Sequence, residues 1–399
     1  MPSRRQFLAG VGATGALGVA GCLATESRDS TTGAAAQTDE DARTDWPRPA
    51  FDRGWTSYNP DPVGPRSNPT VQWSTELAGL PTGRPVVADG TVFVPCSDTL
   101  LALDAESGEE RWQAGDEDDR YLRSPSVHDG TVYAATGGGR AFALDAETGE
   151  ERWTFETDRN ALSTPTLGYG GRTLYVGDDH GTVYALAAET GEEEWRRDVF
   201  GPVTRLVADG PALIVGTEGG EVYLLDAYGE RGYWRTKLGG AVQALAVKNQ
   251  DVFAGGFGGP LARLQSGAFA GTPRWQSDAV TAHSSLVVTD DAVYGTDGSG
   301  LAAVDARSGE TRWTAGDDYF SGPAAAGDTV YVGGDGRVDA YALDGGVGVD
   351  DVRFGAKRWS ADVEGGVQEG LAVADGAVFA LTTTEDASRA CAIEERNDD

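Results

Sequence analysis

The chain of 399 residues carries 63 acidic side chains against 32 basic ones, which gives a formal net charge of -31 at pH 7. A field this negative repels nucleic-acid phosphates and anionic lipid headgroups, so it excludes nucleic acid as a partner and direct adsorption to an anionic membrane. Acidic surfaces stay soluble in salt-rich surroundings, where screening weakens self-repulsion. We therefore expect an exported haloarchaeal protein; a low-salt protein that gathers divalent cations is the alternative.

The N-terminus has the pattern of an export signal. The first residues match the twin-arginine pattern through Arg4 and Arg5, and the apolar stretch that follows is too short to span a membrane. This stretch ends in Val19–Cys22, which resembles a lipobox. Residues 1–22 are therefore predicted to be a twin-arginine signal peptide, with lipid attached to Cys22 and the protein anchored to the outer face of the cytoplasmic membrane. An unmodified Cys22 in a membrane-spanning start is the alternative.

Residues 23–45 differ in composition from the rest of the chain. They are rich in Ser, Thr, Ala, Gly, Asp and Glu and contain almost no large apolar side chains. Such a segment cannot bury enough apolar surface to offset the entropy lost on folding. We expect a disordered acidic tether that connects the lipid anchor to a single domain over residues 46–399.

A repeated phrase occupies this domain and is clearest in residues 124–155. Asp129-Gly130 separates two runs rich in β-branched and aromatic residues, and later turns separate two more, which predicts four antiparallel strands joined by tight turns. Four strands with a period of about forty residues are typical of a β-propeller blade. Each copy closes on a tryptophan, which we expect to fill the wedge between neighbouring sheets rather than to stack on a ligand. These tryptophans are Trp73, Trp112, Trp153, Trp195, Trp234, Trp275, Trp313 and Trp359.

The two ends of the repeat array complete each other. Residues 71–75 have the pattern of a fourth strand with no first three strands before them, and the last copy runs through residues 378–380 and 390–393 without a tryptophan strand. We therefore predict an all-β fold, an eight-bladed β-propeller of four-stranded antiparallel blades whose ring is closed by the N-terminal strand. Closure would remove the exposed sheet edges of an open array. An open solenoid is the alternative.

The turn phrase that ends in Gly-Glu-x-x-Trp, as in residues 103–112, 144–153 and 304–313, resembles the repeat of the pyrroloquinoline-quinone (PQQ)-like propeller family. The resemblance covers the chain from about residue 70 onwards. A lipid-anchored propeller of this kind is similar to the BamB-type lipoproteins of this family. The family's enzymes hold the quinone against calcium at the mouth of the central channel, with a stacking tryptophan, oxygen ligands and a general-base aspartate. Many of them also use two adjacent cysteines. This chain has no Cys-Cys pair and no long insertions between blades, so the resemblance assigns no catalytic residue.

Other chemical patterns are weak. The three histidines lie in different repeats without zinc spacing, and Asp178-Asp179 fits a hairpin turn as well as a metal site, so no metal is expected. The sequence contains no P-loop and no Gly-x-Ser-x-Gly elbow. Cys96 and Cys391 are predicted to be buried free thiols, with a disulfide across the closing seam as the alternative.

The mouth of the central channel is the expected place for a ligand, because the first strand of each blade is the innermost one. Three arginines there, in so acidic a chain, suit a carboxylate or a phosphate; a polar, water-filled pore entrance is the alternative. A lengthened segment over residues 345–356 is a second candidate for contacts. The candidates that enter first strands are Arg84, Arg123, Arg205, Gln243, His283 and Gln368.

From these features we expect a monomeric, lipid-anchored propeller outside the membrane that acts as a non-enzymatic scaffold for protein contacts or assembly. Neither a catalytic residue nor a cofactor is expected, and the sequence does not identify the protein partner. The rival function, implied by the family resemblance, is a PQQ- and calcium-dependent dehydrogenase of alcohols or sugars. A third possible function is the binding of a small ligand or a polymer at the channel mouth.

Overall fold

The computed structural model describes residues 45–396, apart from residues 117–118, 159, 267–269, 281–283, 297–299, 317, 350–351 and 355. The predicted export signal with Arg4, Arg5 and Cys22, and the predicted tether up to residue 44, lie outside the described residues. The described part is built from β-strands, and its helical structure is the 3-10 turn η2 (Tyr169–Gly171). No helix in this part is long and apolar enough to cross a membrane.

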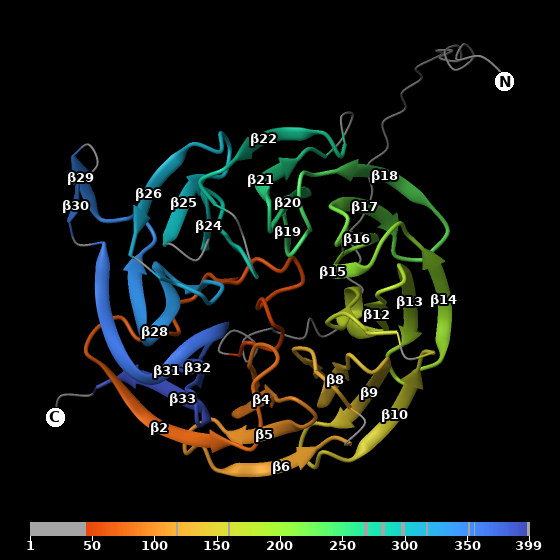
Figure 1. Ribbon diagram of the computed structural model, residues 1–399, viewed down its shortest axis with the longest axis horizontal. Helices are drawn as coiled ribbons and strands as arrows, with labels where there is room; N and C mark the ends of the chain where they lie inside the picture. The colour runs from red at the N-terminus through yellow and green to blue at the C-terminus, as the bar shows by residue number, and fades with distance from the viewer. Residues whose placement is uncertain are drawn as a thin grey trace, which may run out of the picture. The chain divides into compact units, whose positions relative to one another are not determined.

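Six four-stranded antiparallel sheets follow one another along the chain and surround a central axis (Figure 1). We call them blades 1 to 6. The order of the strands in each sheet follows their order in the sequence, because short turns connect them. Blades 1 to 3 consist of β3 (Val86–Ala88), β4 (Thr91–Pro95), β5 (Leu100–Asp104) and β6 (Glu110–Ala114); β7 (Ser126–His128), β8 (Thr131–Ala135), β9 (Arg140–Asp145) and β10 (Glu151–Glu156); and β11 (Thr166–Leu167), β12 (Thr173–Gly177), β13 (Thr182–Ala187) and β14 (Glu193–Asp198).

The hairpin turns that the sequence predicts are present. Asp129 and Gly130 connect the first two strands of blade 2 with φ values of 46° and 65°, the left-handed geometry of a type I′ turn. Asn249 and Gln250 connect the same strands of blade 5 with φ values of 52° and 68°. Blades 4 to 6 consist of β15 (Val203–Asp209), β16 (Ala212–Thr217), β17 (Glu221–Asp226) and β18 (Gly232–Lys237); β19 (Ala244–Lys248), β20 (Asp251–Gly256), β21 (Gly259–Leu264) and β22 (Pro273–Ser277); and β23 (Val287–Val288), β24 (Ala292–Thr296), β25 (Leu301–Asp305) and β26 (Thr311–Ala315).

The remaining blades share one sheet of seven strands, ordered β1-β27-β28-β31-β32-β33-β2. Its long strands β28 and β31 each serve as two strands of the repeat. The first part of β28 pairs with β27 and the second with β31, while the second part of β31 pairs with β32. The register thus gives two further four-stranded groups, blades 7 and 8. Their strands are β27 (Ala324–Ala326), β28 (Thr329–Ala342), β31 (Lys357–Ala374), β32 (Ala377–Thr383), β33 (Ser388–Glu395) and β2 (Pro69–Leu77).

Strand β2 closes the ring, and this confirms the prediction made from the two ends of the repeat array. It pairs antiparallel with β33 over its whole length, with Val71 opposite Ile393 and Thr75 opposite Ala390 (Figure 1). The fourth strand of blade 8 therefore comes from the start of the domain. No free sheet edge remains at this join.

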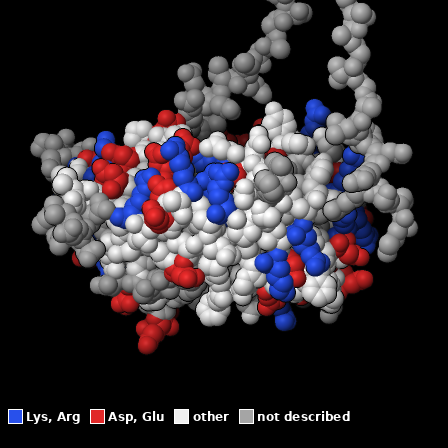
Figure 2. Space-filling model, turned by 90° about the horizontal axis from the view of Figure 1, so that it is seen from above, with Lys and Arg blue, Asp and Glu red and all other residues white. Residues whose placement is uncertain are grey.

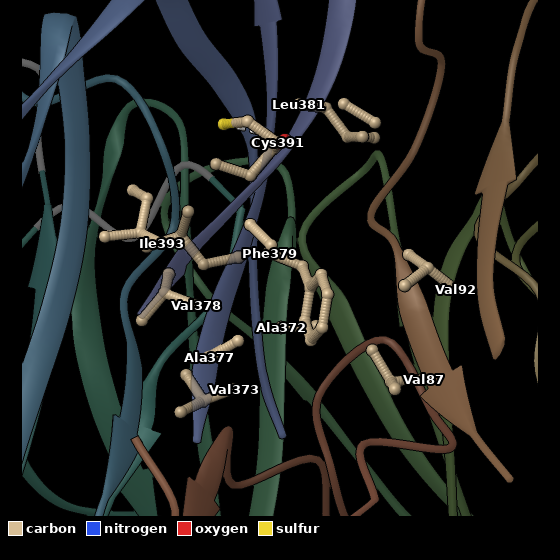
Figure 3. Close-up of a cluster of buried hydrophobic side chains, with 14 of the residues drawn as sticks. Val87, Val92, Ala372, Val373, Ala377, Val378, Phe379, Leu381, Cys391 and Ile393 are labelled. Atoms are coloured by element: carbon tan, nitrogen blue, oxygen red, sulfur yellow. Dashed lines mark hydrogen bonds between the residues drawn. The ribbon is translucent and has the colours of Figure 1, made fainter. Parts of the chain in front are cut away.

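Apolar side chains of neighbouring blades form the core between them. At the seam between blades 8 and 1, Phe379 and Ile393 share one buried cluster with Val87 (Figure 3). Cys391 and Cys96 belong to the same cluster as buried free thiols, in agreement with the prediction. Burial raises the pKa of both thiols to about 12, because an apolar environment disfavours the thiolate.

The tryptophan that closes each copy packs against the following blade. Trp153 of blade 2 lies over Gly191 in a turn of blade 3, and its indole N–H donates to the Ala188 carbonyl at 2.8 Å. A Cβ at position 191 would approach the ring to 2.5 Å, so this close packing requires glycine. Trp195 and Trp234 are only half-buried. An equivalent bond to the following blade or the chain before β2 is donated by Trp73, Trp112, Trp275, Trp313 and Trp359.

Residues 46–63, which we call the strap, run along the inner edges of the first strands and across the centre of the ring (Figure 1). The sequence did not predict this role, because the segment shows no strand alternation and binds largely through its backbone. The strap therefore occupies the channel that an eight-bladed ring would otherwise leave. Its backbone bonds join Trp46 to Val87, Pro47 to Val127, Gly54 to Val247, Thr56 to Val288, Ser57 to Ala325 and Val63 to Gly376, and β1 (Tyr58–Asn59) pairs parallel with β27.

Charged side chains are intermixed on the outside. On the face shown in Figure 2, acidic and basic groups lie beside one another. Ion pairs such as Arg196–Glu193 at 2.7 Å and Arg389–Glu364 at 3.1 Å join some of them. Because the chain has 63 acidic and 32 basic residues, many carboxylates have no basic residue with which to pair.

Candidate functional site

Four of the predicted candidates meet near the ring axis. Arg84, Arg123 and Gln243 lie one to three residues before the first strands of blades 1, 2 and 5, and Arg205 lies within the first strand of blade 4. They line two pockets, which share Arg205 and Thr164. Because the first strand of each blade is the innermost one, residues that are up to 159 positions apart in the sequence, from Arg84 to Gln243, lie close together here.

Arg84 reaches the centre of the ring and is buried, with 6% of its surface exposed. Its Nη1 donates to the Pro49 carbonyl of the strap and its Nη2 to Oγ of Ser284, both at 3.3 Å. The guanidinium lies close to Gly370, where a Cβ would approach Nε to 2.8 Å. Together with Trp55 of the strap, Arg84 lines a cavity of about 20 Å³, which is enough for one water molecule.

The second pocket is larger, about 260 Å³, and contains the side chains of Arg123, Arg205 and Gln243. Arg123 is positioned by its Nε, which donates to the Leu162 carbonyl at 2.8 Å. Arg205 donates from Nη1 to the Thr204 carbonyl at 3.2 Å, while its buried Nε has no hydrogen-bond partner. The other polar residues that line this pocket are Ser163, Thr164, Thr204 and Asp179.

Glu369 is the acidic residue that acts on all three arginines. Burial raises the pKa of this carboxyl, against the opposing effect of Arg84, Arg205 and Arg123. The pKa of Arg84 is lowered to about 9, first by burial and then by the charge of Arg205. Burial and then the charge of Arg123 lower the pKa of Arg205 to about 10, and burial also lowers that of Arg123. Burial and the positive charge of a neighbouring arginine both disfavour a charged guanidinium, so the arginines lie close together at an electrostatic cost.

The remaining two predicted candidates fare differently. Gln368 is exposed and lines neither axial pocket, whereas its neighbour Glu369 is the residue that acts on the arginines. The sequence analysis did not identify Glu369, although its distance in sequence from the following hairpin turn could have indicated it. Arg123, Gln243 and Glu369 each lie six residues before a turn residue with positive φ, namely Asp129, Asn249 and Asp375. His283 lies outside the described residues.

The lengthened segment in blade 7 forms a small hairpin of its own. Strands β29 (Val347–Val349) and β30 (Val352–Phe354) pair as a two-stranded sheet with Val347 opposite Phe354. Val347 is 76% exposed. None of the residues that line the axial pockets comes from this hairpin.

A groove between blades 3 and 4 presents exposed aromatic rings. It measures about 730 Å³ and is lined by Tyr169, Trp195 and Tyr228, together with Pro211 and Arg172. Tyr169 and Tyr228 are 73% and 72% exposed. Tyrosine, tryptophan and arginine are the residue types enriched at the centres of protein–protein interfaces. No pattern in the sequence indicates this groove, because it forms where a 3-10 turn of blade 3 and a shortened turn of blade 4 lie beside each other.

The fold and its repeat define a closed β-propeller of the PQQ-like type. The chain belongs to the family described as outer membrane protein assembly factor BamB, whose model matches residues 66–178 and 179–398. No curated protein sequence matches the chain.

Solved structures show the same fold. BamB from Moraxella catarrhalis superposes with a TM-score of 0.67 at 19% identity, over 84% of this chain and 99% of that one. The quinohemoprotein alcohol dehydrogenase ADHIIG from Pseudomonas putida HK5 gives a TM-score of 0.72 at 14% identity, over 88% and 80%. The quinohemoprotein alcohol dehydrogenase from Comamonas testosteroni gives 0.72 at 16%, over 89% and 81%. At these identities the likeness concerns the fold alone.

The axial residues do not fit the calcium ion that accompanies the quinone in the family's enzymes. Three arginines repel a divalent cation, and the acidic residues near them are Glu369 and Asp179. No group of three or more His, Cys, Asp and Glu side chains that could hold a metal occurs among the described residues. The charge of this region instead favours an anion.

Proposed function

We propose that the protein is a non-enzymatic scaffold for protein contacts or assembly. In this proposal the twin-arginine signal with Arg4 and Arg5 exports it, lipid on Cys22 anchors it to the outer face of the cytoplasmic membrane, and a monomeric propeller displays its surface to a protein partner. Membership of a family described as an assembly factor supports the role. The acidic chain suits a salt-rich exterior.

The observation that carries the proposal is the aromatic groove between blades 3 and 4. Tyr169 and Tyr228 expose most of their rings at a hollow of about 730 Å³, and Trp195 lies between the two blades there. Burying such rings against a partner gains apolar contact area at a low cost in side-chain entropy. Neighbouring Glu194 and Arg172 provide polar groups at the same groove, as at the rim of an interface.

Site-specific photo-crosslinking in native membranes at high salt tests the scaffold. A photoreactive residue in place of Tyr228 should give a discrete adduct with one membrane-associated protein, and Tyr169→Ala should weaken that adduct. The matched control is a photoreactive residue in place of Tyr121, which is 64% exposed but lies outside the groove. The same adducts at both positions, or none at Tyr228, would contradict the proposal.

The rival dehydrogenase is favoured by the quinohemoprotein neighbours in fold alone. Reconstitution with PQQ and calcium decides between the two functions. The scaffold predicts no bound-quinone absorbance and no dye reduction with alcohols or sugars. Dye reduction that depends on both additives would overturn it.

A further inference from the structure

The three axial arginines have few protein partners. Among the described residues, none of them forms an ion pair, although the chain carries 63 acidic residues. Their guanidinium groups make four hydrogen bonds to protein oxygens. Each guanidinium has five N–H donors, so these four bonds leave most of the donors without a protein acceptor.

Three positively charged guanidinium groups with few protein acceptors are unfavourable near the ring axis unless an anion accepts their remaining hydrogen bonds. A buried charge is normally paired or fully hydrogen-bonded, because desolvation of the charged form is unfavourable. Here Arg84, Arg123 and Arg205 lie near two carboxyls, the half-buried Glu369 and the exposed Asp179, so positive charge is still in excess. The buried Nε of Arg205 has no acceptor at all and belongs to the residue that the two pockets share.

The larger pocket has the size and donors for a small anion. Its volume of about 260 Å³ lies below the range of about 300–1,000 Å³ that is typical of drug-sized ligands. Besides the guanidinium groups of Arg123 and Arg205, it contains the amide of Gln243 and the hydroxyl of Thr164. Guanidinium groups bind carboxylate and phosphate oxygens in two-bond geometry, which gives orientation as well as affinity.

We propose that this axial pocket binds a small anion with at least two negative charges on carboxylate or phosphate oxygens. Arg123 and Arg205 hold the anion, Gln243 orients it, and Arg84 supplies positive charge from the centre of the ring. Pro49 and Trp55 of the strap line the inner cavity, which shares Arg205 and Thr164 with this pocket. The site needs no protein partner and so goes beyond the scaffold.

Isothermal titration of the full protein with citrate and, separately, with inorganic phosphate tests the site, in sodium chloride of constant high ionic strength. Saturable binding is expected for at least one anion; which of them binds distinguishes the carboxylate from the phosphate source. Arg205→Gln and Arg123→Gln should each weaken binding about tenfold or more, because each removes charge-assisted hydrogen bonds. Glu369→Gln should tighten it several-fold, because it removes a competing negative charge.

Arg196→Gln is the matched control, since Arg196 is exposed, pairs with Glu193 and lies outside the pocket. Its affinity for the anion should equal that of the wild type. Thermal melts without oxyanion separate binding from folding: Arg205→Gln should be at least as stable as the wild type there, and less stabilised by added citrate or phosphate. No saturable binding of either anion, or equal losses in Arg205→Gln and Arg196→Gln, would overturn the proposal.

Discussion

Single aspartates hold the turn between the third and fourth strands of several blades. In blade 1, Oδ1 of Asp104 accepts the backbone N–H of Ser107 at 2.8 Å, and its Oδ2 pairs with Arg111 at 2.6 Å. Asp145 with Arg152 and Asp305 with Arg312 repeat this arrangement. The side-chain bond from arginine and the backbone bonds lower the pKa of these carboxyls to about 2.

The lowered pKa gives a pH-dependent prediction for Asp104→Asn. A carboxyl with a depressed pKa in the folded state contributes stability above its unfolded pKa of 3.8, and the contribution is lost as the pH falls through about 2. The variant should therefore unfold at a lower urea concentration than the wild type at pH 7, and the difference should shrink between pH 4 and pH 2. Asp386→Asn, at an exposed position, is the control. A difference that does not change with pH would show that the charge is not its cause.

The position of a residue relative to the first strand of its blade predicts most of the axial residues, but not all of them. Arg84, Arg123, Arg205 and Gln243 were identified because entry to the innermost strand fixes their place. Glu369 was missed because its strand is entered through the long strand β31 without a turn, so the first position of the blade is hard to locate in the sequence. Counting back from the turn at Asp375 corrects the position.

At the scale of elements, the contact between a fourth strand and the next blade recurs around the ring. The sequence predicted one large aromatic residue in each wedge. It could not predict the bond from the indole N–H to the following blade, because that bond depends on the angle between two sheets. The strap could not be predicted either. Its hydrogen bonds use backbone groups, which every residue carries, so side-chain patterns do not reveal them.

Two tryptophans offer a matched comparison of this contact. Trp153 donates to the Ala188 carbonyl and is 8% exposed, whereas Trp234 is half-buried. Trp153→Phe keeps an aromatic ring but leaves the carbonyl without its donor, which should cost about 1–3 kcal/mol of unfolding free energy. Trp234→Phe should cost less, because its surroundings can admit water. Urea unfolding of both variants measures the difference, and equal costs would show that packing alone accounts for the tryptophans.

At the scale of the whole molecule, the join of β2 to β33 makes the two ends of the domain depend on each other. This feature could be predicted, because residues 71–75 lack the first three strands of a blade and the last copy lacks its fourth. The pairing of Val71 with Ile393 confirms that reasoning. What the repeat could not predict is that its first and last blades also meet the strap, whose Trp46 shares the buried cluster of the seam with Phe379.

The charge of the whole molecule predicts that its stability rises with salt. A net charge of -31 repels itself in the compact state, and a chain with 32 basic residues cannot neutralise 63 acidic ones by internal ion pairs. Screening shortens the range of this repulsion from about 10 Å at 0.1 M salt to about 3 Å at 1 M. The melting temperature followed by circular dichroism should therefore rise steeply between dilute buffer and molar sodium chloride. A variant in which several exposed Asp and Glu residues are replaced by Asn and Gln should show a smaller rise, because less repulsion remains to be screened. A melting temperature that is the same in dilute buffer and in molar salt would contradict both the prediction and the halophilic origin that we propose for the acidic composition.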